Sequence, residues 1–454
     1  MPNSFEILAR RLDEKQTGSK AFGKFAELGD TGLKSDWGWI NEEYLTKLSG
    51  SKAIAVYTEM RDTAIVAAIL NAIEMLARQA KFRIDPASNK KKDIAAALFV
   101  ESNFNDMSMS WQDTLSEILS MLWAGWSFHE IVYKQRNGFD NQPGMSSEFD
   151  DGKIGWRKLP IRSQDSLFRW EMDAAGGVQG MHQLSPTSFS INFIPIQKAL
   201  LFRPASYKNN PQGRSLLRSA YREWWFVKRI QEIEGIGVER DLAGLPVLRL
   251  PAEVLQDSAK FDAWKQLLVD VRRNDQEGIA IPSDTWEDTS EPMYQFELMN
   301  SGGERQFNTS EIIDRYDLRI AQSLLADFIH LGSTSAGSKG LGRAKMSMFT
   351  TAMKGWLDDI ADTFNRHAIP RLMRLNESEA SNPRMVFEDV DLWPIDDLAE
   401  GIQKLANAGM PLFPNPRLEN VLLDLMGLPK MSEDEIQERI TEDEETKDER
   451  ARAA

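Results

Sequence analysis

The segment from Asn209 to Gly237 combines a turn with a long helical pattern, and its two faces constrain what the chain can fold into. Apolar residues fall on one flank at about 100 degrees per residue: Leu216, Leu217, Ala220, Trp224, Val227 and Ile230. Another flank carries the basic stripe: Arg214, Arg218, Arg222, Lys228 and Arg229. The turn at Pro211 and Gly213 predicts where the helix starts, and Gly235 and Gly237 predict where it stops. One helix is therefore expected to offer a packing surface and a charged surface, the latter either solvated or functional.

Size and composition exclude several classes of protein. At 454 residues the chain is expected to form two or more structural units. It has no cysteine, so disulfides, thiolate metal sites and cysteine nucleophiles are excluded. No window approaches 18 uninterrupted apolar residues, and the first residues lack the apolar stretch of a signal peptide, which predicts a soluble protein made in the cytoplasm without a membrane partner. A net charge of −15 argues against binding nucleic acid over the whole surface but allows a transient contact with DNA.

The order of periodic segments predicts an α+β fold that is predominantly helical. Helices are expected over residues 58–82, 110–125, 309–330 and 344–375, with two more around 398–408 and 417–426. Short β-prone runs between 127 and 202 predict an antiparallel or mixed sheet with helices beside it. A small α/β unit, 239–300, is inserted between two helices that could lie side by side. A Gly/Ser-rich loop spans 332–343, and the tail from Ser432 is acidic and poor in apolar residues.

Catalytic chemistry is sparse in this sequence. Histidine occurs only at positions 129, 182, 330 and 367, with no pair at metal-ligand spacing, so no metal, no cofactor and no enzymatic activity are predicted. Neighbouring carboxylates such as Asp358 and Asp359 are expected on a helix surface, where nothing marks them as an acid/base pair. The loop resembles a phosphate-binding loop only in part, because Ser338 follows Gly337 and Gly340 follows Lys339 where a Walker motif needs Lys and then Ser or Thr.

Several phrases in this order resemble the portal proteins of tailed bacteriophages, in particular the Mu-type branch, over roughly residues 55–428. They are AGWSFHEIVYK, GKIGWRKLPIRSQDSLFRW, NNPQGRSLLRSAYREWWFVKR, and LGSTSAGSKGLGRAKM followed by NRHAIPRLMRLNE. The resemblance implies a portal fold with the following parts: an N-terminal arm and wing (1–212), a stem helix (213–238), a clip (239–300), a second stem helix (301–331), a tunnel loop (332–343), a long helix and wing (344–395), a crown (396–431) and an acidic tail (432–454).

The resemblance also implies a function and a set of partners. The chain would form a ring of about twelve copies at one capsid vertex, through which double-stranded DNA is packaged and ejected. Its partners would be the large terminase, the major capsid protein and the head-tail adaptor, and it would reside in the virion after assembly in the host cytoplasm. Ser338, Lys339, Arg343 and Lys345 would contact DNA, and Trp264 and Trp286 would be the clip's candidate anchors for partners, or else part of the clip's own core.

Three alternatives remain open from the residues alone. The basic stripe could face DNA or pair with Glu223, Glu232 and Glu234 of neighbouring helices, and we favour pairing. The chain could be another oligomeric capsid or tail structural protein, which would need no DNA channel. It could also be a cytosolic enzyme that uses the 332–343 loop as an anion site.

Overall fold

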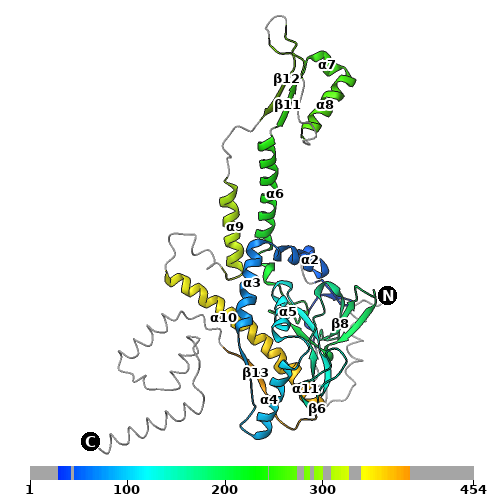
Figure 1. The fold of residues 1–454 in the computed structure, drawn as a ribbon, viewed down its shortest axis with the longest axis vertical. Helices are drawn as coiled ribbons and strands as arrows, with labels where there is room; N and C mark the ends of the chain where they lie inside the picture. The colour runs from blue at the N-terminus through cyan, green and yellow to red at the C-terminus, as the bar shows by residue number, and fades with distance from the viewer. Residues whose placement is uncertain are drawn as a thin grey trace, which may run out of the picture. The chain divides into compact units, whose positions relative to one another are not determined.

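The fold is described here from a computed structural model over residues 29–41, 45–243, 245–272, 281–286, 291–299, 308–326 and 339–388 (Figure 1). The chain divides into two compact units, residues 1–388 and 389–454. The second unit lies outside the described residues. The predicted crown, the helices around 398–408 and 417–426, and the acidic tail therefore also lie outside them.

The first part of the described chain contains the helices α2 (Gly50–Arg61), α3 (Ala64–Gln79), α4 (Lys91–Asn105) and α5 (Trp111–Ala124). The helix predicted at 110–125 is confirmed at both ends, since Ser110 accepts a hydrogen bond from the backbone N–H of Asp113 at 3.0 Å and Gly125 adopts a left-handed φ of 95°. The single helix predicted at 58–82 is wrong. It is interrupted at Thr63, whose extended backbone (φ −73°, ψ 135°) precedes α3.

The strands form several small antiparallel sheets instead of one. The structure pairs β4 (Ser127–Glu130) with β10 (Ala199–Phe202), β5 (Val132–Asn137) with β6 (Asp150–Lys158), β3 (Phe82–Asp85) with β13 (Arg384–Phe387), and the short β1 (Ser35–Asp36) with β2 (Trp39–Ile40). A three-stranded sheet has the order β7 (Leu167–Met172), β8 (Val178–Leu184) and β9 (Ile191–Pro195). Its buried face packs Trp170, Met181 and Ile194 against Trp126 and Phe128, so each small sheet needs its neighbours to complete a core.

Aromatic side chains from distant parts of the sequence pack together in the first unit. The ring of Phe104 in α4 lies 5.1 Å from Trp156 in β6 and 5.7 Å from Phe364, which opens a π-helix (Phe364–Ala368). This π-helix connects α10 (Lys339–Thr363) to α11 (Ile369–Leu375). Side chains more than 200 residues apart in the sequence thus share one core.

Two buried cations fasten the β5–β6 hairpin to α4. The Nζ of Lys134 lies 3.1 Å from Oδ2 of Asp106, and the two side chains are only 1% and 2% exposed. Arg136 donates from Nη1 to Oγ of Ser102 in α4 at 3.0 Å and pairs with Asp151 of β6 at 3.2 Å. Because buried charges are costly unless paired, these contacts fix the hairpin's position on α4.

A long helix, α6 (Tyr221–Ala243), leads to the inserted unit, and α9 (Thr309–Ser323) returns from it. Only a short 3-10 turn (Leu216–Arg218) precedes α6, so the predicted single helix from the 213 turn is wrong in its first residues. The predicted stop at Gly235 and Gly237 is also wrong, because α6 continues through both; glycine costs a helix only about 1 kcal/mol per residue. The return helix ends at Ser323, short of the predicted 330, and Leu325 has a left-handed φ of 59°.

The inserted unit consists of β11 (Leu245–Arg249), α7 (Ala252–Gln256), α8 (Ser258–Arg272) and β12 (Gln295–Met299). The two strands pair antiparallel, and α8 is in contact with β11. The predicted α/β character of this unit therefore agrees with the described residues. The strand expected in GIAIPSD (278–284) is not formed by its described part, 281–284. Thr285, directly after it, makes an isolated bridge to Pro292.

Candidate functional site

The helices α6 and α9 lie side by side and form the helical pair that the sequence predicted (Figure 1). The rings of Phe226 and Tyr316 stack with centroids 5.9 Å apart and an interplanar angle of 13°. Closer to the C-terminal end of α6, Glu234 accepts a hydrogen bond from Oγ1 of Thr309. These two contacts set the register of an antiparallel pair, because the second lies about two turns from the first on each helix.

The pair is anchored at its base by side chains of the helical layer. Nε1 of Trp224 donates a hydrogen bond of 2.8 Å to Oγ1 of Thr63, the residue that separates α2 from α3. On α9, Ile320 and Ala321 are fully buried, and α3 contacts this helix. The apolar flank of the pair therefore packs within the subunit, as the predicted packing surface requires.

The predicted basic stripe does not lie on one helix. Arg214 precedes the short 3-10 turn and Arg218 ends it, whereas Arg222, Lys228 and Arg229 are on α6. The extended backbone at Ser215, which caps the 3-10 turn with its side chain, breaks the helical phase on which the prediction relied.

Two of the α6 cations have carboxylate partners within the chain. Lys228 forms an ion pair with Glu59 of α2, and this hydrogen bond raises the pKa of Lys228. Arg229 pairs with Glu232 one turn along α6, at 2.8 Å. Arg222 lies over the Phe226 ring at 5.9 Å. Glu59, which sequence reasoning missed, lies on a helix far away in the chain and carried no signal for this contact.

The inserted unit places the two predicted anchor tryptophans in different environments. Trp264 in α8 is half-buried and stacks on Tyr294, with ring centroids 5.7 Å apart and an interplanar angle of 26°. Trp286 is 46% exposed, and its backbone N–H donates to the carbonyl of Glu291 at 2.9 Å. Trp286 is thus the more accessible of the two. Tyr294, the partner of Trp264, was not foreseen because the contact joins two separate elements.

The predicted tunnel loop is shorter than expected at its C-terminal end. Helix α10 begins at Lys339 instead of Ala344, so Gly340 and Gly342 are helical and do not add backbone freedom there. The structure places Lys339 and Arg343 on the first turn and a half of α10 and Lys345 about half a turn beyond Arg343, where it is half-buried. Ser338 lies outside the described residues.

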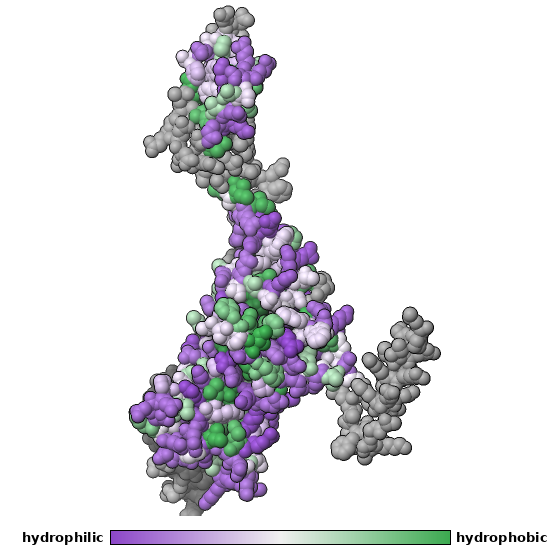
Figure 2. All heavy atoms as spheres, turned by 90° about the vertical axis from the view of Figure 1, so that its right-hand side faces the viewer, coloured by the Kyte–Doolittle hydropathy of each residue, from purple (hydrophilic) through white to green (hydrophobic). Residues whose placement is uncertain are grey.

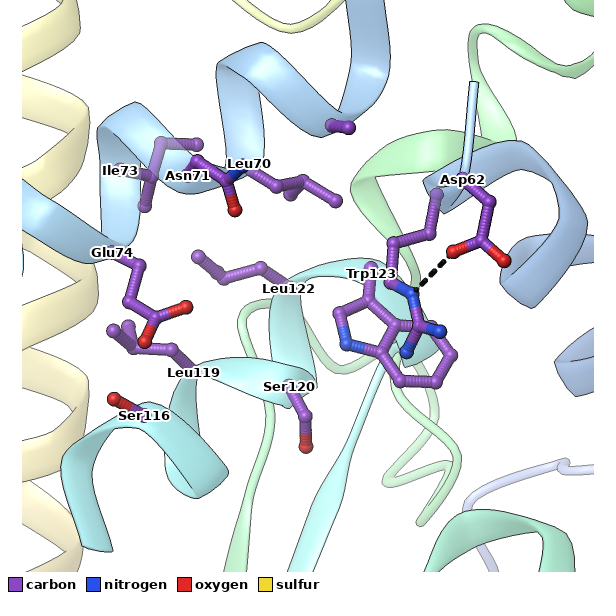
Figure 3. A pocket seen from close by; sticks show the side chains of 12 residues that line it. Asp62, Leu70, Asn71, Ile73, Glu74, Ser116, Leu119, Ser120, Leu122 and Trp123 are labelled. Atoms are coloured by element: carbon purple, nitrogen blue, oxygen red, sulfur yellow. Dashed lines mark hydrogen bonds and ion pairs between the residues drawn. The ribbon is translucent and has the colours of Figure 1, made fainter. Parts of the chain in front are cut away.

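A groove of about 290 Å³ separates α3 from α5 (Figure 3). Its walls are of mixed character: Leu70 and Ile73 of α3 lie opposite Leu119 and Leu122 of α5. The same walls also carry polar side chains: Asn71, Glu74, Ser116 and Ser120. At one end the guanidinium of Arg61 lies 4.9 Å from the Trp123 ring centroid, with its Nε 3.2 Å from Oδ1 of Asp62. No histidine or cysteine is among the residues that line this groove.

The described histidines occupy structural positions. His129 is fully buried, donates from Nδ1–H to the carbonyl oxygen of Leu159 (2.9 Å), and has a pKa lowered by burial to about 4. Burial also lowers the pKa of His367, and His182 lies 3.0 Å from Oε2 of Glu171. Within the described ranges no group of three or more His, Cys, Asp or Glu side chains could hold a metal ion, and no helix there is long and apolar enough to cross a membrane.

Comparison with known proteins agrees with this arrangement. Residues 54–440 match the sequence family described as the portal protein of Mu bacteriophage. The chain therefore belongs to the Mu-type portal protein family, which confirms the resemblance seen in the sequence and the predicted α+β portal fold.

Solved structures show distant similarity. A chain in the neck of an empty gene transfer agent particle has 11% identity and a TM-score of 0.49, covering 84% of this chain and 94% of its own. A chain of the native gene transfer agent virion has 11% identity and a TM-score of 0.47, covering 83% and 94%. An HK97-family phage portal protein from Corynebacterium diphtheriae has 12% identity and a TM-score of 0.44, covering 74% and 97%.

Proposed function

We propose that this chain is the subunit of a portal ring, in which about twelve copies surround an axial channel at one capsid vertex. Double-stranded DNA enters the capsid through this channel during packaging and leaves through it during ejection. The observation that carries the proposal is the portal-family match over residues 54–440, together with two long helices that bracket an inserted α/β unit.

The parts of the chain take the following roles in this proposal. The pair α6 and α9 forms the stem and lines the channel, and the inserted unit between them forms the clip. The helical layer and small sheets on either side form the wing, while residues 396–431 form the crown. The segment 332–343 forms the tunnel loop, with its last residues on the first turns of α10.

Charge supports a conduit for DNA. The net charge of −15 disfavours tight binding of a polyanion, which would stall translocation. Ser338, Lys339, Arg343 and Lys345 supply a few contacts to the phosphate backbone in each subunit, and such contacts position DNA without reading its sequence. The α6 cations Lys228 and Arg229 are already neutralised within the subunit, which favours pairing over DNA contact for this part of the stripe.

The clip docks the large terminase and later the head-tail adaptor, and the wing contacts the major capsid protein. Trp286 is the better clip anchor, since its side chain is 46% exposed whereas Trp264 stacks inside the unit. The protein acts as a structural component of the virion, assembled in the host cytoplasm, and not as an enzyme.

The mass of the purified full-length chain tests the ring. Twelve copies of a 51.5 kDa chain give a particle of about 620 kDa, measured by light scattering after size exclusion. A single species at 51.5 kDa across salt and protein concentrations would contradict the proposal. A closed ring without an axial hole would instead favour another capsid or tail structural protein.

A further inference from the structure

A second face of α6, which points away from α9, carries exposed large apolar side chains beside charged ones. Exposure of such apolar side chains to water is unfavourable, so this face is a candidate for packing against another surface. Its members recur with alternating spacings of four and three residues: Trp225, Arg229, Glu232 and Ile236. Trp225 is 39% exposed and Ile236 is 49% exposed, and Ile233 beside them is 68% exposed. Figure 2 shows such hydrophobic residues at the surface in separate patches among hydrophilic ones. This spacing is that of a helix-packing seam.

The outer face of α9 carries a comparable set with similar spacing. Its exposed members are Glu311, Asp314, Arg315 and Leu318. The two faces differ in composition, so a contact of one with the other joins unlike surfaces. A contact between unlike faces of identical subunits is the kind that closes a ring.

We infer that the outer face of α6 in one copy of this chain packs against the outer face of α9 in the next copy. The inference rests on the proposed ring, in which both helices run along the channel axis. Rotation about that axis moves a residue around the ring without raising or lowering it. Residues that lie at one level within a subunit therefore meet at the same level across the seam.

The register within the subunit gives those levels. Phe226 lies level with Tyr316, and Glu234 lies level with Thr309. Counting along the antiparallel helices from either contact places Trp225 at the level of Leu318, and Arg229 at the level of Asp314, to within one residue along the axis. An apolar side chain thus meets an apolar one, and a cation meets an anion.

The remaining charges can be accommodated on this seam. Glu232 lies level with Glu311, and these two carboxylates would repel each other. Arg315 lies one turn from Glu311 on α9, and its side chain is long enough to reach Glu232. Arg229 currently pairs with Glu232 on its own helix. Both partners are exposed, so exchanging this pair for contacts across the seam costs little.

Cross-linking between different chains tests the seam, and the absence of cysteine from the natural sequence makes the test specific. Full-length Trp225→Cys protein is mixed with full-length Leu318→Cys protein carrying a different tag, assembled and oxidised. The expected product is a disulfide-linked dimer with one chain of each kind, because packed helices bring facing positions within disulfide range. Gln231→Cys with Glu311→Cys is the matched control: the two positions lie level, but Gln231 is on another exposed flank of α6, so this pair should give no such dimer.

A second pair, Arg229→Cys with Asp314→Cys, repeats the test without removing Trp225. Charge reversal gives an independent readout: Arg229→Asp or Asp314→Arg alone should weaken each seam about five-fold, and the two together should restore it. Rings of normal mass that give neither cross-linked dimer, or that give one equally with the control pair, would overturn the seam and leave the portal function standing. Wild-type protein that forms no ring by light scattering would overturn the portal function itself.

Discussion

Replacing Lys134 by Met tests whether the buried ion pair holds the β5–β6 hairpin to α4. The Nζ of Lys134 donates to the carbonyl oxygens of Asp106 and Ser146, at 2.5 and 2.6 Å, and lies 3.1 Å from the Asp106 carboxylate. That carboxylate also accepts hydrogen bonds from Oγ of Ser147 and the backbone N–H of Glu148. Methionine preserves most of the side-chain volume, so the change removes charge and hydrogen bonds with little loss of packing.

The expected loss of stability follows from the burial of the partner. With Asp106 only 2% exposed, its charge would be left buried without a cation, and such a change costs about 3–5 kcal/mol. At roughly 2 °C per kcal/mol for a large domain, the melting temperature should fall by about 6–10 °C. Differential scanning calorimetry of full-length protein at matched concentration measures this shift.

Two comparisons make the result interpretable. Lys52→Met removes an exposed cation of α2 and should change the free energy of unfolding by less than about 0.5 kcal/mol. Adding Asp106→Asn to Lys134→Met removes the uncompensated buried charge and should recover part of the loss. A melting temperature for Lys134→Met within a degree of the wild type would refute the reasoning.

Three further predictions address other regions. For His129, the ordinary pKa of 6.5 falls to about 4 on burial, so the unfolded chain takes up the proton first and this group removes roughly 3 kcal/mol of stability between pH 6.5 and 4. The loss of stability over this pH range, measured by urea unfolding at each pH, should be smaller by that amount in His129→Gln, and an equal loss in variant and wild type would contradict the assignment. Trp286→Ala should abolish terminase or adaptor binding in pull-down assays while rings persist, and equal binding by the variant and the wild type would contradict the anchor role. Trp264→Ala should instead lower the melting temperature, because it removes the stack on Tyr294. Lys339→Ala with Arg343→Ala should leave rings intact and change DNA retention in a salt-dependent way, and unchanged packaging and ejection across salt concentrations would exclude DNA contact.

The sequence predicted those elements whose ends are specified locally. Helix α5 has a serine N-cap and a left-handed glycine at its C-terminal end, and both are visible as residue types at Ser110 and Gly125. The insertion between two helices was likewise visible, because the apolar period changes on either side of it.

Features set by distant contacts could not be read from the sequence. The break between α2 and α3 contains neither Gly nor Pro, and it is stabilised by the hydrogen bond from Trp224 to Thr63. The basic stripe was overestimated because the extended backbone at Ser215 changes the helical phase before α6 starts. The pairing of Lys228 with Glu59 joins residues 169 positions apart, which no local pattern indicates.

Electron microscopy of the purified full-length protein tests the central claim most directly. The account predicts end-on views of closed rings of about twelve subunits with an axial hole wide enough for a DNA duplex. Side views should show the paired helices α6 and α9 running along the axis. Particles that are single subunits, open filaments or rings closed at the centre would contradict the account.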